Sequence, residues 1–313
     1  MKILERVAAT ELLAAGRPVV VLLSGGRDSV CLLDVAVEIA GAAAVRALHV
    51  NYGLRPEADG DEAHCAALCE RLGVPLAVER AARPDDAPGN LQAWARDVRY
   101  ATAARLASAA GPEASVAAAH TATDQAETIL YRLAASPGRR ALLGMTPRSG
   151  RLVRPLLGVT RDETAAWCHA RGLAWREDTT NDSFLYARGR VRAGLVPALR
   201  AVHPAAERNV VRTAELLRDE AEVLDVVVDT ALAGRDRIAV AHLAALPRAL
   251  ARLVVRRLAE TATGGLCARA PARLDDIVAL GDGALDLGDG ARAVVEGGVL
   301  RCERTPRLRA PRT

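Results

Sequence analysis

The sequence predicts an α/β fold with a doubly wound, mostly parallel sheet, followed by a smaller α+β C-terminal domain. Short apolar runs rich in β-branched residues alternate with longer runs of helical spacing up to residue 135. Polar loops follow three of the apolar runs, as expected where parallel strands end at a ligand site. Beyond residue 215, a long helical run and short glycine-punctuated runs replace this alternation. Because 313 residues exceed one typical domain, we expect domains at 1–215 and 216–313.

The first part of the chain provides the expected sheet and the helices that cover it. Its apolar runs are typical of buried parallel strands, which are apolar on both faces. The predicted strands cover residues 19–23, 45–51, 75–78 and 115–119. The predicted helices cover residues 1–15, 56–73, 91–110 and 123–135, and a further helix begins near Ser29.

The rest of the chain is expected to be helical and then to form hairpins. Residues 137–154 are rich in loop signals, 160–171 form a helix, and 177–189 are polar and irregular. Helical sequence resumes at 191 and, after His203-Pro204, continues to about residue 233. A short strand and a helix follow within 238–260. Residues 284–301 contain two glycine-rich turns typical of hairpins.

The composition points to a cytoplasmic protein with no membrane partner. The formal net charge is +4, and no run of about 18 uncharged apolar residues is present. Residues 1–15 lack the apolar centre of a signal peptide. The six cysteines are scattered, and Cys65 and Cys69 have no second pair at zinc-ligand spacing, so we expect reduced thiols.

The most distinctive segment is the polar loop after the first predicted strand, which reads Ser24, Gly25, Gly26, Arg27, Asp28 and Ser29. Backbone N–H groups in such a turn and at the following helix N-terminus form a nest for an anion. Glycine has no Cβ to block the close approach of a phosphate. The loop lacks the lysine of the common ATP/GTP phosphate loop, since Lys2 is the only lysine in the chain. The alternative is an ordinary strand–helix turn with Ser29 as N-cap.

Further motifs accompany this loop. They are HVNYGLRP at 49–56, HTATDQAET at 120–128, RPLL at 154–157, and EDTTND at 177–182, followed by Arg188, Arg190 and Arg192. The loop itself resembles the pyrophosphate-binding loop of enzymes that split ATP into AMP and pyrophosphate. In order and spacing, the motifs within about residues 15–215 resemble the tRNA(Ile)-lysidine synthetase family, whose members are PP-loop ATP-pyrophosphatases with a Rossmann-like fold.

The resemblance implies ATP-dependent joining of free L-lysine to C2 of the wobble cytidine in a tRNA(Ile) with a CAU anticodon. The cytidine C2 oxygen would attack the α-phosphate of ATP, and the lysine ε-amine would then displace AMP from the adenylated tRNA. ATP and Mg²⁺ are therefore expected, with ATP bound by residues 24–29 and by His49, Asn51 and Gly53. Contacts to the substrate tRNA are expected from Arg55, Arg96, Arg99, Tyr100, Arg188, Arg190 and Arg192.

Four residues are expected to carry the chemistry, namely Asp28, His120, Asp124 and Glu127. Asp28 and Asp124 are the hard oxygen ligands available to Mg²⁺ beside the phosphate loop. Asp124 and Glu127 share a helix face, so one can help to hold the metal while the other receives the lysine ammonium. Asp124 is the first candidate for the general base and His120 the second. The alternatives are an Asp124 that only caps a helix, a His120 satisfied at a strand end, and solvated arginines.

Two positions depart from the family pattern, and two other functions remain open. Tyr52 replaces a usual second histidine, and Thr123 replaces one residue of a common Asp-Asp pair. A 2-thiocytidine synthetase would use paired Cys-x-x-Cys motifs, which the chain lacks. A non-catalytic tRNA-binding module would not need an intact phosphate nest with two acidic residues. Residues 216–313 are expected to grip the tRNA outside the chemistry, and a homodimer is compatible with the sequence.

Overall fold

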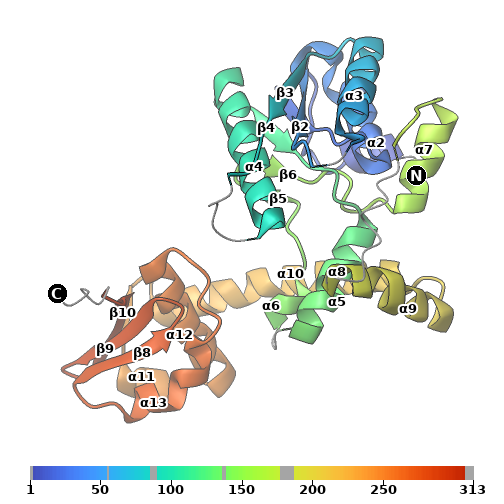
Figure 1. Ribbon diagram of the computed structural model, residues 1–313. Helices are drawn as coiled ribbons and strands as arrows, with labels where there is room; N and C mark the ends of the chain where they lie inside the picture. Colours follow the sequence, from blue (N-terminus) through green and yellow to red (C-terminus); the bar gives the residue numbers. More distant parts are fainter. Residues whose placement is uncertain (1–2, 55, 85–89, 136–138, 177–186, 307–313) are drawn as a thin grey trace. The chain divides into compact units, whose positions relative to one another are not determined.

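The chain divides into two compact units, Met1–Leu217 and Arg218–Thr313 (Figure 1). The computed structural model describes residues 3–54, 56–84, 90–135, 139–176 and 187–306. The boundary falls inside α10 (Ala206–Leu232), the same helix in which the sequence places a division after residue 215.

The first unit contains a six-stranded sheet in the order β3-β2-β1-β4-β6-β5. The strands are β1 (Val19–Leu22), β2 (Val45–Asn51), β3 (Leu76–Arg80), β4 (Ser115–Ala117), β5 (Arg148–Ser149) and β6 (Leu152–Val153). All neighbouring pairs are parallel except β5 with β6. The predicted mostly parallel sheet is therefore confirmed, with β1 at its centre.

Helices cover both faces of this sheet, so the fold is doubly wound (Figure 1). The side chains of Val19 and Val21 pack into one core with α2 (Arg27–Ala40), α3 (Ala58–Leu72) and α7 (Arg161–Ala170). Val20 and Leu22 pack into the opposite core with α4 (Leu91–Ala110). This division follows from the alternation of side chains along a strand.

The remaining elements of the first unit are mostly helical. They are α1 (Ile3–Ala8), η1 (Ala42–Ala44), α5 (Ala122–Ala135), α6 (Arg139–Leu142), α8 (Ala187–Arg190), the π-helix η3 (Val191–Leu195) and α9 (Val196–Val202). Helix α5 contacts α6, α8 and η3, and its residues Ala122 and Ala126 pack against Val211 of α10. The predicted interruption at His203-Pro204 is confirmed between α9 and α10.

Three predictions of local structure are wrong. Residues 187–189, expected to be irregular, begin the helix α8, and the rest of that expected segment, 177–186, lies outside the described residues. The helix expected over residues 1–15 ends at Ala8, because the Thr10 hydroxyl bonds to the Val7 carbonyl oxygen and Glu11 adopts a positive φ of 54°. Residues 137–154, expected to be mainly loop, contribute β5 and β6 to the sheet. Each of these strands has two residues, which is too short to produce an alternating pattern.

The second unit is α+β, as predicted. Its antiparallel sheet has the order β7-β10-β9-β8. The strands are β7 (Arg237–Ala239), β8 (Gly283–Gly288), β9 (Ala291–Glu296) and β10 (Val299–Arg304), and the helices are α11 (Val240–Ala245), α12 (Arg248–Thr263), η4 (Ala270–Arg273) and α13 (Leu274–Ala279). Fully buried Leu243, Val254, Ile277 and Leu300 join the helices to the sheet in a separate core.

None of the helices in the described parts of the chain is both long and apolar enough to span a membrane.

A buried glutamine organises the turn that precedes β5. The Gln125 amide donates to the Met145 carbonyl oxygen at 2.9 Å and accepts from the Met145 N–H at 2.7 Å. Gly144 has a φ of +63°, and a Cβ there would lie 2.6 Å from Gln125 Oε1. Gly150 has a similar φ of +58° but nothing within 4 Å of that position. A comparison of alanine substitutions at Gly144 and Gly150 therefore separates the cost of backbone strain from the cost of side-chain overlap.

Gly144→Ala should lower the free energy of unfolding more than Gly150→Ala. Both substitutions force alanine into the left-handed region, at about 1–2 kcal/mol. Gly144→Ala should cost about 1–3 kcal/mol more, because its methyl group displaces the Gln125 amide. Urea unfolding of both variants measures the difference. An equal decrease in the free energy of unfolding in both variants would show that the Gln125 side chain moves aside without an energetic cost.

Candidate functional site

The predicted phosphate loop and the predicted catalytic residues follow β1 and β4. From β1 the chain adds β2 and β3 on one side of the sheet, and from β4 it adds β5 and β6 on the other side. The point between β1 and β4 is therefore the topological switch of the sheet. Ligands of open α/β sheets bind beyond the carboxyl ends of the strands at such a switch. The loop after β1 leads into α2, and the loop after β4 leads into α5.

The loop at residues 24–29 is held by its own hydroxyl groups. Ser29 Oγ donates to the Gly26 carbonyl oxygen at 2.8 Å and accepts from the Ser24 N–H at 3.1 Å. Gly25 needs its positive φ of 82°, and a Cβ there would lie 3.4 Å from Cys65 Sγ. Gly26 is the N-cap of α2 and has no side-chain capping bond. The alternative in which Ser29 is the N-cap is therefore wrong, and the first N–H groups of α2 suit an anion.

Asp28, in the first turn of α2, is bound by side chains from α7. Thr164 Oγ1 donates to Asp28 Oδ1 at 2.5 Å, and Arg161 Nε lies 3.4 Å from Asp28 Oδ2. Arg27 pairs with the same carboxylate at 3.4 Å. Asp28 is thus a member of the loop, and its charge is balanced by the guanidinium groups of Arg27 and Arg161.

Asp124, in the first turn of α5, has two functions in the structure. Its Oδ2 accepts from the N–H and the hydroxyl of Thr121, both at 2.9 Å, so it caps the helix start. Its Oδ1 accepts from Arg161 Nη2 at 3.2 Å and lies 3.5 Å from Arg192 Nη2. Asp124 Oδ2 therefore caps the helix, as the alternative interpretation expected, while Oδ1 faces the guanidinium groups of Arg161 and Arg192.

Burial acts to raise the pKa of Asp124, but the charge of Arg161 and the hydrogen bonds from Thr121 outweigh it. The pKa of this carboxyl therefore lies below its ordinary value. A carboxylate of lowered pKa is a good ligand for a cation and a weak acceptor of protons. His120 is half-buried, and its charge further lowers the pKa of Asp124.

Glu127 lies one turn further along α5 and is almost completely buried, with 1 % of its side chain exposed. Arg192 of η3 binds it through two parallel bonds, from Nε to Oε1 at 2.7 Å and from Nη2 to Oε2 at 3.0 Å. The predicted common face of Asp124 and Glu127 is confirmed, because Arg192 contacts both.

Arg161 and Thr164 are site residues that the sequence reasoning missed. Arg161 forms ion pairs with both Asp28 and Asp124. The two carboxylates predicted to hold Mg²⁺ therefore pair with the same guanidinium group. A capping box positions the start of α7, with Thr160 as N-cap and Glu163 bonding back to the Thr160 N–H. The Thr-x-x-Glu pattern in the sequence marks the helix start, but it does not indicate which side chains this helix contacts. The hydroxyl of Thr123 accepts from the Arg161 N–H at 3.5 Å.

The end of β2 and the loop after it are held by hydrogen bonds to neighbouring elements. His49 Nδ1 lies 2.9 Å from the Leu23 carbonyl oxygen, so the ring supports the start of the phosphate loop. Asn51 accepts from the Gly53 N–H and donates to Asp59 and Glu62 of α3. These contacts shape the loop near the predicted nucleotide site.

The predicted tRNA contacts are distributed over several elements. Tyr52 donates to the Ala95 carbonyl oxygen and accepts from Arg99 Nε, so this departure from the family pattern joins the β2 loop to α4. The guanidinium of Arg96 lies over the ring of Tyr100, 4.6 Å from its centroid. Arg190 is exposed at the end of α8. Arg55 and the side chain of Arg188 lie outside the described residues.

No trio of histidine, cysteine or acidic side chains that could hold a metal is found in the described part of the chain. Cys65 and Cys69 are buried, and burial raises the pKa of their thiols to about 12 and about 11. Their predicted role as ordinary reduced cysteines agrees with this burial. Asp28 and Asp124 still suit Mg²⁺, because this ion is commonly held by one or two carboxylates together with substrate phosphates.

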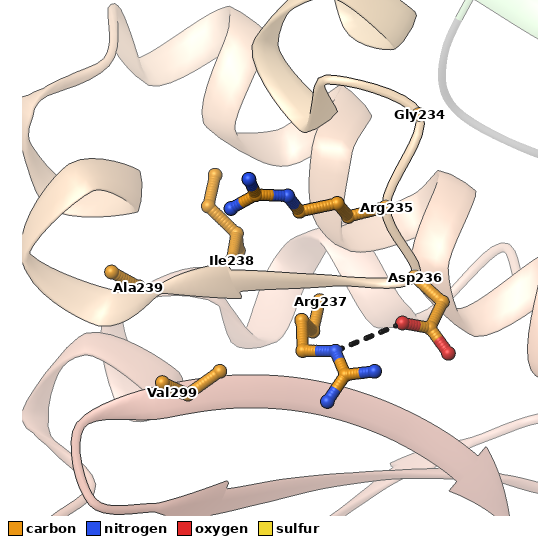
Figure 2. Close-up of a pocket in the computed structure, with 7 residues that line it drawn as sticks. All are labelled: Gly234, Arg235, Asp236, Arg237, Ile238, Ala239 and Val299. Carbon is orange, nitrogen blue, oxygen red and sulfur yellow. Dashed lines mark hydrogen bonds and ion pairs between the residues drawn. The ribbon is translucent and has the colours of Figure 1, made fainter.

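The second unit contains an open hollow of about 700 Å³ beside the edge strand β7. Figure 2 shows Arg235, Asp236 and Arg237 along its rim, with Arg237 paired to Asp236 at 3.1 Å. The remaining lining is Gly234, Ile238, Ala239 and Val299. With a single carboxylate, already paired, the hollow is suited to anion contact rather than to metal-assisted chemistry.

Comparisons with known proteins agree with the geometry of the first unit. The model of the PP-loop domain family matches residues 2–199. The U34-tRNA thiolase NcsA from Methanococcus maripaludis, solved with its [4Fe-4S] cluster, has a similar fold. Its TM-score is 0.57 at 19% identity, with 69% of this chain and 78% of the thiolase covered. At this identity the similarity shows the fold alone.

Curated relatives are more specific. The tRNA(Ile)-lysidine synthase of Thermus thermophilus is 44% identical over 250 residues, covering 79% of this chain and 48% of the relative. The chain thus spans about half the length of that protein. The tRNA(Ile)-lysidine synthase of Gloeobacter violaceus is 36% identical over 270 residues, covering 82% of this chain and 81% of the relative. The chain therefore belongs to the tRNA(Ile)-lysidine synthase family of PP-loop proteins.

Proposed function

We propose that the protein joins free L-lysine to C2 of the wobble cytidine in a tRNA(Ile) with a CAU anticodon, converting ATP to AMP and pyrophosphate. The observation that carries this proposal is the carboxylate pair of Asp124 and Glu127 beside the phosphate loop. It provides a cation-binding point next to an anion-binding point. A reaction between ATP and an ammonium-bearing substrate needs both.

The first step would form a bond between the cytidine C2 oxygen and the α-phosphorus of ATP, with pyrophosphate as leaving group. The N–H groups of residues 24–29 and the start of α2 would receive the charge of the pyrophosphate. Asp28 and Asp124 would hold Mg²⁺, which supplies charge neutralisation at the phosphates when bound. Arg161 keeps these two carboxylates together.

The second step would form a bond between the lysine ε-nitrogen and C2, with AMP as leaving group. Glu127 would orient the ammonium, which loses one proton to water to become the nucleophilic amine. The lowered pKa of Asp124 makes it a weak base, so His120 in its neutral form is the better candidate to accept the second proton, from the amine as it bonds to C2. Asp124 then serves as a cation ligand.

Arginines around the site would bind the tRNA. Arg96, Arg99, Arg190 and Arg192 provide guanidinium groups for phosphates, and Tyr100 provides a ring that also contacts Arg96. Because tRNA is the substrate, the proposal places the reaction in the cytoplasm. A homodimer remains a prediction.

A 2-thiocytidine synthetase is the second candidate, favoured only by the fold that the chain shares with a tRNA thiolase. Five of the six cysteines are buried, and they form no set of three metal ligands in the described structure. This arrangement favours lysine transfer over sulfur transfer.

Labelled lysine tests the proposal directly. With ATP, Mg²⁺ and tRNA(Ile), the purified protein should release pyrophosphate and transfer the label to the tRNA. A tRNA with uridine at the wobble position should accept none, because uridine has an N3–H and a C4 carbonyl in place of the N3 lone pair and the C4 amino group that make the C2 oxygen of cytidine a nucleophile. Absence of pyrophosphate would disprove the enzymatic function. Pyrophosphate without label would leave adenylation standing and remove lysine as substrate.

Asp28→Asn and Asp124→Asn should each slow pyrophosphate release by about 100-fold or more, because each removes a charged ligand from the predicted metal site. Both variants should also need more Mg²⁺ for half-maximal rate. Asp162→Asn is the matched control, since this exposed aspartate lies in the first turn of α7 beside Arg161. Equal rates in all three variants would contradict the assigned metal site.

The hollow beside β7 should contribute to tRNA affinity but not to chemistry. Replacing Arg235 and Arg237 together with glutamine should weaken tRNA binding and reduce its salt slope by about 2. The rate at saturating tRNA should not change. Arg248→Gln is the control, since it removes an exposed arginine of the same unit that pairs with Asp275. An unchanged salt slope in the double variant would exclude this surface from tRNA contact.

A further inference from the structure

The cation-binding point of the site is filled by a side chain of the protein itself. Arg192 makes two bonds to Glu127 and lies 3.5 Å from Asp124, so one guanidinium serves both carboxylates. Glu127 is 1 % exposed and Arg192 is 25 % exposed. A carboxylate this deeply buried is stable only with a cation beside it. The oxygens that would orient a substrate ammonium are therefore occupied.

We infer that Arg192 is a placeholder for the substrate ammonium: it neutralises Asp124 and Glu127 until a phosphate group draws it away, and only then can the amine bind. This inference rests on the proposed function, since it assigns the order in which that site takes its ligands. Arg192 acts here as a positioning residue that sets this order.

The exchange conserves the number of ion pairs. Before it, Arg192 pairs with the buried carboxylates. After it, the ammonium pairs with Glu127 and Asp124 keeps its pair with Arg161. Arg192 then pairs with phosphate, which binds a guanidinium through two bonds as a carboxylate does. No buried charge is left without a partner at either end, so the exchange avoids the large penalty of an isolated buried Glu127.

The backbone that carries Arg192 is suited to such a change. Arg192 lies in η3, a π-helical segment of five residues between two α-helices. π-helical turns inside α-helices are rare, and those that occur are often found at functional sites. A return of this segment to α-helical geometry would turn Arg192 around the helix axis and away from Glu127. The phosphate can come from ATP or from the tRNA backbone.

Lysine affinity measured by calorimetry distinguishes these possibilities in the unmodified protein. Lysine is titrated into the protein alone, with a non-hydrolysable ATP analogue, and with tRNA(Ile). Lysine can bind only to the fraction of molecules in which Arg192 has left Glu127, so a small fraction lowers the apparent lysine affinity. We therefore expect lysine affinity to rise about tenfold or more in at least one phosphate-bearing state. The state that produces the rise identifies the source of the phosphate. Equal affinity in all three states would overturn the inference.

Arg192→Gln should remove the dependence on phosphate, so that lysine binds with the same affinity in all three states. Arg200→Gln is the matched control, because this arginine lies in the adjoining helix α9 and pairs with Glu207 at the surface. It should behave as the unmodified protein does. Retention of the phosphate dependence in Arg192→Gln would also overturn the inference. If circular dichroism shows that this variant is unfolded, the three titrations of the unmodified protein decide alone.

Transfer of labelled lysine to tRNA, measured in parallel, separates this inference from the proposed function. Transfer together with equal lysine affinity in all states would remove only the placeholder role. Absence of both transfer and lysine binding in every state would overturn both.

Discussion

The balance of charge at the switch point is the constraint on which the site depends. Asp28, Asp124 and Glu127 come from two helices, and Arg161 and Arg192 join them. Carboxylates so close together and so little exposed would repel one another without these cations. The arginines therefore balance the charge of these acidic groups and hold them in place where a metal ion and an ammonium are proposed to bind.

The surrounding fold positions those arginines. Helix α7 presents Arg161 because Thr160 and Glu163 cap its start, and Arg6 of α1 pairs with Glu163 at 2.6 Å. Further along α7, Trp167 Nε1 donates to the buried Asp34 of α2 at 2.9 Å. These contacts attach α7 to the helix that begins at the phosphate loop, so Arg161 meets Asp28 at a fixed distance. The loop, α2 and α7 therefore form one support for the proposed adenylation chemistry.

Much of the fold followed from local patterns. The strand and helix alternation of residues 19–135 and the glycine turns near the C-terminus each have a period or a turn residue that identifies them. The helix over residues 1–15 was predicted too long, since Leu12 and Leu13 are buried as expected of a helix although the chain has already turned at Glu11. The strands β5 and β6 escaped prediction because their two residues become strands only by pairing with each other and with β4.

The sequence by itself determined the sheet class and located the loop and the acidic residues Asp28, Asp124 and Glu127 that are predicted to act there, because these depend on local periodicity and on short motifs. Only the tertiary structure decided which cations those acids meet. Arg161 and Asp28 are far apart in sequence, and so are Arg192 and Glu127, so no spacing could predict their contacts. The physical reason is that Coulomb interactions depend on distance in space, which the packing of α7 and η3 against α2 and α5 sets.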